Sequence, residues 1–105
     1  MDKQPTVLSQ VPPVYPDSAK KAGVEGTVYV KILVSEEGKA VKAIVIKSDN
    51  VVFNQPSIDA ALKFVFTPAI KDKVPVMVWV VVPFKFKLNK PITTQKDSIS
   101  TQMGK

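Results

Sequence analysis

Two short strings in the sequence match motifs of serine-dependent acyl-transfer enzymes. Ser18-Ala19-Lys20-Lys21 fits the pattern S-x-x-K, and Ser48-Asp49-Asn50 spells S-D-N. In penicillin-recognising enzymes these motifs form one site together with a K-T-G, and the serine of S-x-x-K is the nucleophile. The sequence contains no K-T-G, and its 105 residues are too few for that fold. We therefore interpret Ser18 as a first-turn helix residue and Ser48 as the end of a strand.

The other polar residues do not form a catalytic or metal-binding pattern. The sequence has no histidine and no cysteine, which removes the commonest general base, the commonest thiol nucleophile and the usual zinc ligands. Glu36 and Glu37 are adjacent in a turn-like stretch, where solvation explains them. Asp49 and Asn50 indicate a turn, because no further oxygen ligands follow at the spacing that calcium requires. With no glycine-rich phosphate loop either, we expect a protein that is not an enzyme and has no cofactor.

The composition fits a single soluble domain with a modest core. Apolar residues make up 45 % of the chain, and a domain of this size buries roughly two thirds of its unfolded surface. No stretch approaches the roughly 18 apolar residues of a membrane-spanning helix, and the first residues lack the apolar centre of a signal peptide. We therefore expect no membrane span in this chain.

The basic charge does not predict nucleic-acid binding. The net charge of +6 comes from fifteen lysines, with no arginine for bidentate contacts to phosphate or guanine. The stretch 84–87, Phe-Lys-Phe-Lys, resembles the aromatic and basic mixture of single-strand binders. Strand alternation, however, turns both phenylalanines to one face and both lysines to the other, so bases could not stack beside the lysines. No nucleic acid is expected as a partner.

The first half of the chain predicts a linker, a short helix and two strands. Residues 1–13 hold three prolines and resemble the end of an extended linker, and the domain proper is expected to span 14–89. Pro16 suits a first helical turn, and Gly23 can close the helix. From 27 to 34 apolar residues alternate, and the inward side chains are expected to be Val28, Val30, Ile32 and Val34. A turn at 35–38 leads into a second strand at 39–48, which makes a hairpin.

The second half predicts one more helix and one more strand. Asn54 is the expected helix cap, Pro56 lies in the first turn and Pro68 stops the helix. The apolar spacing gathers Ile58, Ala61, Leu62 and Val65 on one helical face. A long third strand is expected over 74–88, and the polar residues 90–105 resemble a disordered tail.

The order helix, strand, strand, helix, strand fixes the expected topology. Keeping the sheet antiparallel after the helical crossover requires the third strand to pair with the first. The sequence therefore predicts an α+β fold, with a three-stranded antiparallel sheet in the order 2-1-3 and two helices on one face. Pro83 agrees with an edge position for the third strand, because proline is tolerated at a sheet edge and rarely inside a sheet.

These residues also carry a resemblance to a known family. The stretch from residue 12 to 88 is similar to the C-terminal domain of the TonB family of energy transducers. Phe64 stands where the family often has tryptophan, and the family's N-terminal membrane helix and proline-rich spacer are missing from this sequence, so we expect a fragment or a freestanding relative. The matching features, in order, are Pro13-Val14-Tyr15-Pro16, Ala19, Gly23, Glu25-Gly26, Gly38, Ser48, Phe66-Thr67-Pro68-Ala69 and Pro75-Val76.

The resemblance implies a function in the periplasm of a bacterium with an outer membrane. Such domains bind the TonB box, a short extended segment of an outer-membrane transporter, and transmit force from a proton-motive complex in the inner membrane to drive transport such as iron uptake. The full-length protein would be anchored in the inner membrane. Binding would occur by strand addition to the exposed edge of the third strand.

Carried over by position, the partner-binding surface combines the third strand with the start of the domain. Its expected residues are Val14, Tyr15, Pro16, Val78, Trp79, Val80, Val81, Val82, Pro83, Phe84 and Lys85. In strand addition the backbone makes the contact, so the side chains of Val78, Val80 and Val82 are expected in the core. Tyr15 is either a contact residue or a staple that fixes where the first helix starts.

A second surface leaves another function open. On the sheet face opposite the helices, Trp79 is either an interface anchor or is partly shielded by the tail. The alternative function is therefore a TonB-like interaction or self-association domain of a signalling or cell-envelope protein, with a homodimer or an exchange of the third strand. The expected apolar residues of this face are Tyr29, Leu33, Met77, Trp79 and Val81.

Overall fold

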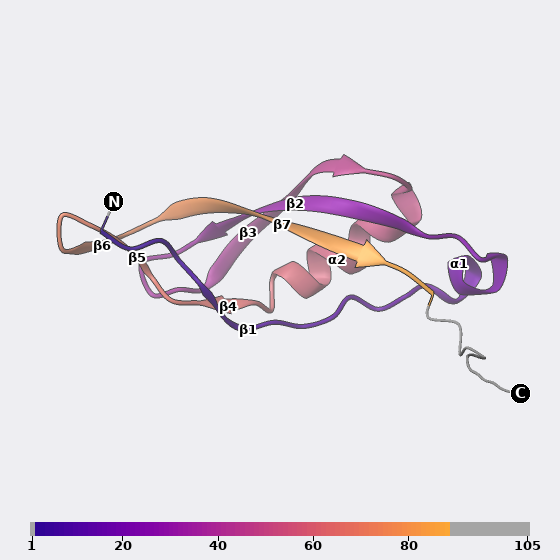
Figure 1. The fold of residues 1–105 in the computed structure, drawn as a ribbon, viewed down its shortest axis with the longest axis horizontal. Helices are drawn as coiled ribbons and strands as arrows, with labels where there is room; N and C mark the ends of the chain where they lie inside the picture. The colour runs from indigo at the N-terminus through magenta and orange to yellow at the C-terminus, as the bar shows by residue number, and fades with distance from the viewer. Residues whose placement is uncertain (1, 89–105) are drawn as a thin grey trace, which may run out of the picture.

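A computed structural model of the chain describes residues 2–88 as an elongated α+β domain (Figure 1). A short 3₁₀ helix, Val51–Phe53, precedes the second α-helix. The elements are β1 (Val7–Ser9), α1 (Asp17–Ala22), β2 (Gly26–Val34), β3 (Ala40–Ser48), α2 (Asn54–Ala61), β4 (Val65–Phe66), β5 (Ala69–Lys71), β6 (Val74–Val76) and β7 (Val78–Phe86).

The main sheet has the predicted topology. Its order is β3-β2-β7, and both pairings are antiparallel, so the first long strand lies in the centre. β7 pairs with β2 along its whole length, from Gly26 opposite Phe86 to Val34 opposite Val78. Two small sheets, β1-β4 and β5-β6, were not predicted from the sequence.

The core lies on one face of the main sheet. Val28, Val30, Ile32 and Val34 are fully buried, as the alternation in the sequence predicts. α2 packs against β2 and β3 on this face, while α1 lies at one end of the domain and contributes the buried Ala19 (Figure 1). The two helices therefore contribute to one core on one face of the sheet.

The limits of α1 follow from local chain chemistry. Pro16 is the N-cap, one residue before the first helical turn in which we placed it. Gly23 ends the helix with φ 72°, and its N–H bonds to the carbonyl oxygens of Ala19 and Lys20. Residues with a side chain rarely adopt this left-handed conformation, so the predicted role of Gly23 is confirmed.

The start and the buried face of α2 differ from the prediction. Asn54 is the first residue of α2 and not its cap: the N-cap position is Phe53, which makes no side-chain capping bond. Asn50 caps the preceding 3₁₀ helix, where its side chain accepts a hydrogen bond of 3.0 Å from the N–H of Val52. The helix ends at Ala61, so Leu62 and Val65 lie beyond it and are 45 % and 41 % exposed. The expected apolar face is therefore right for Ala61, which is buried, and wrong for Leu62 and Val65; the helix also buries Ser57 and Ala60.

The long strand expected over 74–88 is two strands that separate at Met77. β6 turns back onto β5 through Asp72 and Lys73, which both have positive φ values of 52° and 68°. Two consecutive left-handed residues are the geometry of a two-residue hairpin turn. Only β7 joins the main sheet, and β6 belongs to a separate hairpin at the far end of the domain (Figure 1).

The first residues, for which we predicted a linker, are extended and pair with the domain. β1 pairs with β4, and the Thr67 N–H donates to the Thr6 carbonyl at 2.8 Å. Asp2 and Lys3 bond to Ile70 of β5. The predicted tail, 90–105, lies outside the described residues. Within the described range no helix is both long enough and apolar enough to cross a membrane.

Candidate functional site

β7 is the strand for which we predicted partner binding, and its outer edge is unpaired among the described residues. Among residues 2–88, β7 pairs with β2 on one side and with no other strand. The nine residues of β7 therefore present a row of backbone groups along the edge of the main sheet.

Pro83 indicates which backbone groups face outward. In an antiparallel pair, successive residues direct their backbone N–H and C=O groups alternately toward the partner strand and away from it. Proline has no N–H and is tolerated where that position faces away from the sheet. Pro83 lies opposite Tyr29 without interrupting the register, so we expect its backbone, and by alternation that of Trp79, Val81 and Lys85, to face the free side.

A groove runs beside the second half of this edge. It has a volume of about 420 Å³, and it separates β7 from the N-terminal segment that precedes α1. The groove therefore leaves a hollow next to this part of the free edge. Its lining residues are Gln10, Val11, Pro12, Pro13, Phe64, Val82, Pro83, Phe84 and Lys85.

The predicted side chains of β7 divide between the two faces of the sheet. Val78, Val80 and Val82 are partly buried against the core, as predicted, and Phe84 is only 4 % exposed. These four side chains are therefore largely closed to a partner, and by the alternation described above their backbone N–H and C=O groups face β2. Trp79, Val81, Pro83 and Lys85 are exposed on the opposite face.

Tyr15 connects the start of the domain to the end of β7. Its ring packs edge-on against Phe53 and Phe86, with ring centroids 5.6 Å apart in both pairs. Its hydroxyl donates a hydrogen bond to the carbonyl of Val24. Burial, and then the negative charge of Glu25, raise the pKa of the Tyr15 phenol. These contacts agree with the predicted staple, and they place Tyr15 at one end of β7.

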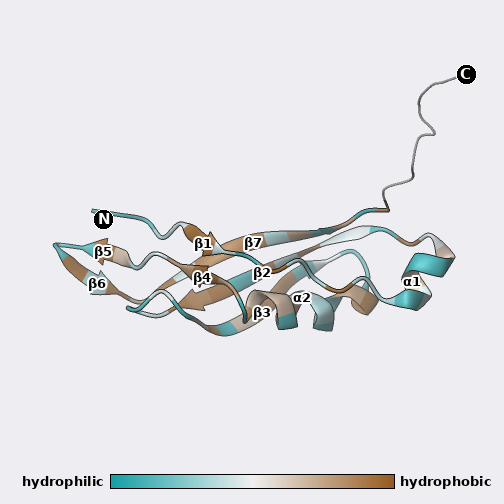
Figure 2. Cartoon of the chain, turned by 90° about the horizontal axis from the view of Figure 1, so that it is seen from below, coloured by the Kyte–Doolittle hydropathy of each residue, from teal (hydrophilic) through white to brown (hydrophobic). Residues whose placement is uncertain are grey.

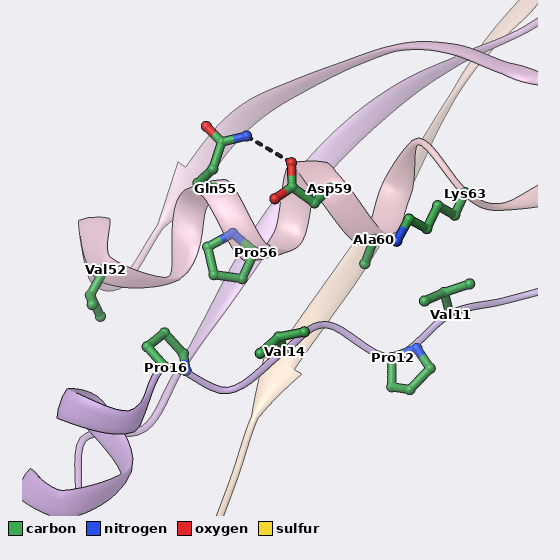
Figure 3. Close-up of a pocket in the computed structure, with 10 residues that line it drawn as sticks. All are labelled: Val11, Pro12, Val14, Pro16, Val52, Gln55, Pro56, Asp59, Ala60 and Lys63. Atoms are coloured by element: carbon green, nitrogen blue, oxygen red, sulfur yellow. Dashed lines mark hydrogen bonds between the residues drawn. The ribbon is translucent and has the colours of Figure 1, made fainter.

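Val14 and Pro16 lie on the other side of the N-terminal segment, where a second groove separates it from α2 (Figure 3). This groove has a volume of about 470 Å³. At its rim the Gln55 side chain donates a 2.8 Å hydrogen bond to Asp59. The sequence predicted Val14 and Pro16 as site residues but not this groove, because its walls are distant in sequence. The lining residues are Val11, Pro12, Val14, Pro16, Val52, Gln55, Pro56, Asp59, Ala60 and Lys63.

Comparison with known proteins gives the same family for sequence and fold. Residues 11–88 match the family model of the Gram-negative bacterial TonB protein C-terminal region. The chain is 36 % identical over 89 residues to Protein TonB of Vibrio cholerae; the match covers 84 % of this chain and 36 % of that protein. The chain thus spans about a third of the length of this relative. It also resembles the solution NMR structure of the Pseudomonas aeruginosa TonB CTD, with a TM-score of 0.69, 28 % identity, and coverage of 87 % of this chain and 93 % of that one.

Proposed function

The chain belongs to the family of Gram-negative bacterial TonB C-terminal domains, and from this membership we propose that it is the periplasmic binding module of a TonB-type energy transducer. In this role it is not an enzyme. It binds the TonB box of an outer-membrane transporter, while the full-length protein is anchored in the inner membrane. Transport of cargo such as iron then depends on force that passes through this domain.

The observation that carries this proposal is the free edge of β7, nine residues long, with a groove beside it. A peptide added there as a further strand would form backbone hydrogen bonds along the edge. Each bond contributes about 0.5–1.5 kcal/mol, and ordering the peptide opposes binding. A handful of such bonds gives micromolar affinity, which suits a reversible connection.

The position of the edge also suits the transmission of force. A peptide pulled along the axis of β7 loads its hydrogen bonds together, whereas a peptide pulled away from the sheet opens them one after another. We propose that the transporter segment is pulled along the strand. A modest affinity is then enough to carry load for a short time.

Titration with synthetic peptides from the plug segments of outer-membrane transporters, followed by amide NMR, tests the binding site. We expect the largest shifts at the outward-facing residues Trp79, Val81 and Lys85, with weaker shifts at Val14 and Tyr15. Val51, which is 79 % exposed on the 3₁₀ helix, is an exposed valine away from β7 and serves as the control, because its amide signal should not shift. If saturating peptide shifts only residues outside β7 and the groove, the proposed site is wrong.

Self-association is the second candidate, and the same free edge supports it. Two copies of β7 could pair with each other in an antiparallel arrangement, which would occupy the edge that a peptide needs. Size-exclusion chromatography with light scattering at two concentrations distinguishes the two roles. A monomer that binds peptide supports the transducer role, and a dimer that excludes peptide supports self-association.

A further inference from the structure

Within its three strands, the main sheet carries charge of one sign only on its outer face, opposite the core; just beyond β3, the Asp49 carboxylate accepts a hydrogen bond of 2.8 Å from the Thr27 N–H. The three strands contain four lysines and neither aspartate nor glutamate. The register places all four lysines on this face: Lys42, Lys47 and Lys85 lie opposite the outward residues Leu33, Tyr29 and Thr27 of β2, and Lys31 lies on β2 itself.

The same face is also strongly apolar. Two irregularities in the pairing of β3 with β2 each insert an extra residue, Ile46 beside Lys47 and Val41 beside Lys42. Both inserted residues are half exposed, so the irregularities enlarge the apolar surface. β7 also carries hydrophobic colour along much of its length (Figure 2). The large exposed residues of this face are Tyr29, Val41, Ile44, Ile46, Met77, Trp79 and Val81, with exposed fractions between 37 % and 55 %.

The lysines and the aromatic rings of this face are arranged together. The Nζ of Lys31 lies 4.8 Å from the ring centroid of Trp79, and that of Lys47 lies 5.9 Å from the ring centroid of Tyr29. Aromatic rings and lysines together are typical of the boundary between lipid and water, where the rings sit at headgroup level and the ammonium groups reach the phosphates.

We propose that this outer face, defined by the four lysines and the seven exposed apolar residues, binds the surface of a bilayer that contains anionic phospholipids. The apolar side chains would enter the interface, and the lysines would contact the phosphate groups. Of the four lysines and seven apolar residues that define this face, only Lys85 lines one of the two grooves described above.

Charge argues against a second copy of the chain as the occupant. A symmetric dimer through this face would bring lysines of both copies together, and the strands supply no carboxylate to pair with them. An acidic polypeptide would satisfy the lysines, but its own charges would meet the seven apolar residues. An anionic bilayer surface satisfies both features.

The single tryptophan of the chain, Trp79, reports on the proposal directly. Titration of the full chain with phosphatidylcholine vesicles that contain phosphatidylglycerol should shift its fluorescence to the blue, and vesicles of phosphatidylcholine alone should produce little shift. Removing one lysine charge should weaken binding about fivefold, so Lys42→Gln/Lys47→Gln together should lose roughly 25-fold. Lys20→Gln/Lys21→Gln on α1 is the matched control, with the same net charge and an expected loss below about threefold.

The apolar part of the face is tested by one more pair of variants. Ile44→Ser should weaken vesicle binding severalfold, and Val51→Ser, at an exposed site on the 3₁₀ helix, should not change it. Equal losses in the two lysine variants would overturn the proposal, because binding would then follow net charge alone. An equal blue shift with soluble polyglutamate, or a dimer formed through Trp79 in light scattering, would assign the face to another partner and overturn it too.

Discussion

Replacing Val81 with proline tests whether a partner uses the backbone of β7. By alternation with Pro83, the N–H of Val81 is expected to point to the free side of β7, and the Val81 side chain is 55 % exposed. Val81→Pro therefore removes a donor that no residue within 2–88 is expected to use. The main sheet should keep its pairing, because a proline already occupies an equivalent position two residues later.

The expected effect on binding is that of one backbone hydrogen bond. Such a bond contributes about 0.5–1.5 kcal/mol, so the affinity for a transporter peptide should fall about 2- to 13-fold. Val81→Ala shortens the same side chain and keeps the N–H, so its affinity should stay within about twofold of the wild type. Val80→Pro removes an N–H that faces β2 and should destabilise the fold instead.

Fluorescence anisotropy of a labelled peptide measures the affinities, and circular dichroism verifies the fold. Pro83→Ala is the reciprocal variant, because it adds a backbone N–H on the free side of β7. It should bind the peptide as tightly as the wild type or a few times more tightly. Edge addition is refuted if a folded Val81→Pro binds like the wild type, or if Val81→Ala loses as much as Val81→Pro.

Three further predictions concern the residues that hold the fold together. Burial and a nearby carboxylate raise the pKa of Tyr15, so the stabilising effect of its neutral phenol on the folded state should be complete below about pH 10 and disappear as the pH rises through the raised pKa. Unfolding of the wild type and of Tyr15→Phe, measured as a function of pH, tests this. Gly38→Ala should prevent folding or destabilise severely, because φ is 88° and the new methyl group would overlap the carbonyl oxygen of Phe66, whereas Gly23→Ala meets open space and should cost about 1–2 kcal/mol in urea unfolding. Phe53→Ala should lose about 3–5 kcal/mol in the same assay, because the ring is fully buried and stacks on another ring at 4.2 Å.

The main sheet was predictable because its signals are local. Alternation along β2 identified the four inward residues, and the order of the elements with one proline identified β7 as the edge. The two irregularities in β3 left no such signal, since each adds one residue without breaking the apolar pattern. The composition of the outer face was visible in the sequence, but the apolar residues that these irregularities add were not.

The errors arose where a local pattern continued past the end of an element. Apolar spacing suited to a helix runs on through Leu62 and Val65, although the helix ends at Ala61. The turn residues of the β5-β6 hairpin are Asp72 and Lys73. Lys73 has a φ of 68° and occupies the position where a glycine normally marks such a turn in the sequence. The two grooves lay beyond sequence reasoning altogether, because both depend on where the N-terminal segment comes to lie.

That segment determines how tension would reach the binding edge if the domain works as a transducer. The side chains of β1 are all exposed, so the hydrogen bonds of residues 2–9 have little packing to protect them. Val11 and Tyr15 are the first side chains of the described chain that pack against the core cluster. Tyr15 contacts Phe86, which is the last residue of β7. The contact between Tyr15 and Phe86 therefore connects the N-terminal segment directly to β7, while Phe53 and the Val24 carbonyl hold the same side chain in the core, which is a physical reason for a proline-flanked tyrosine where the domain begins.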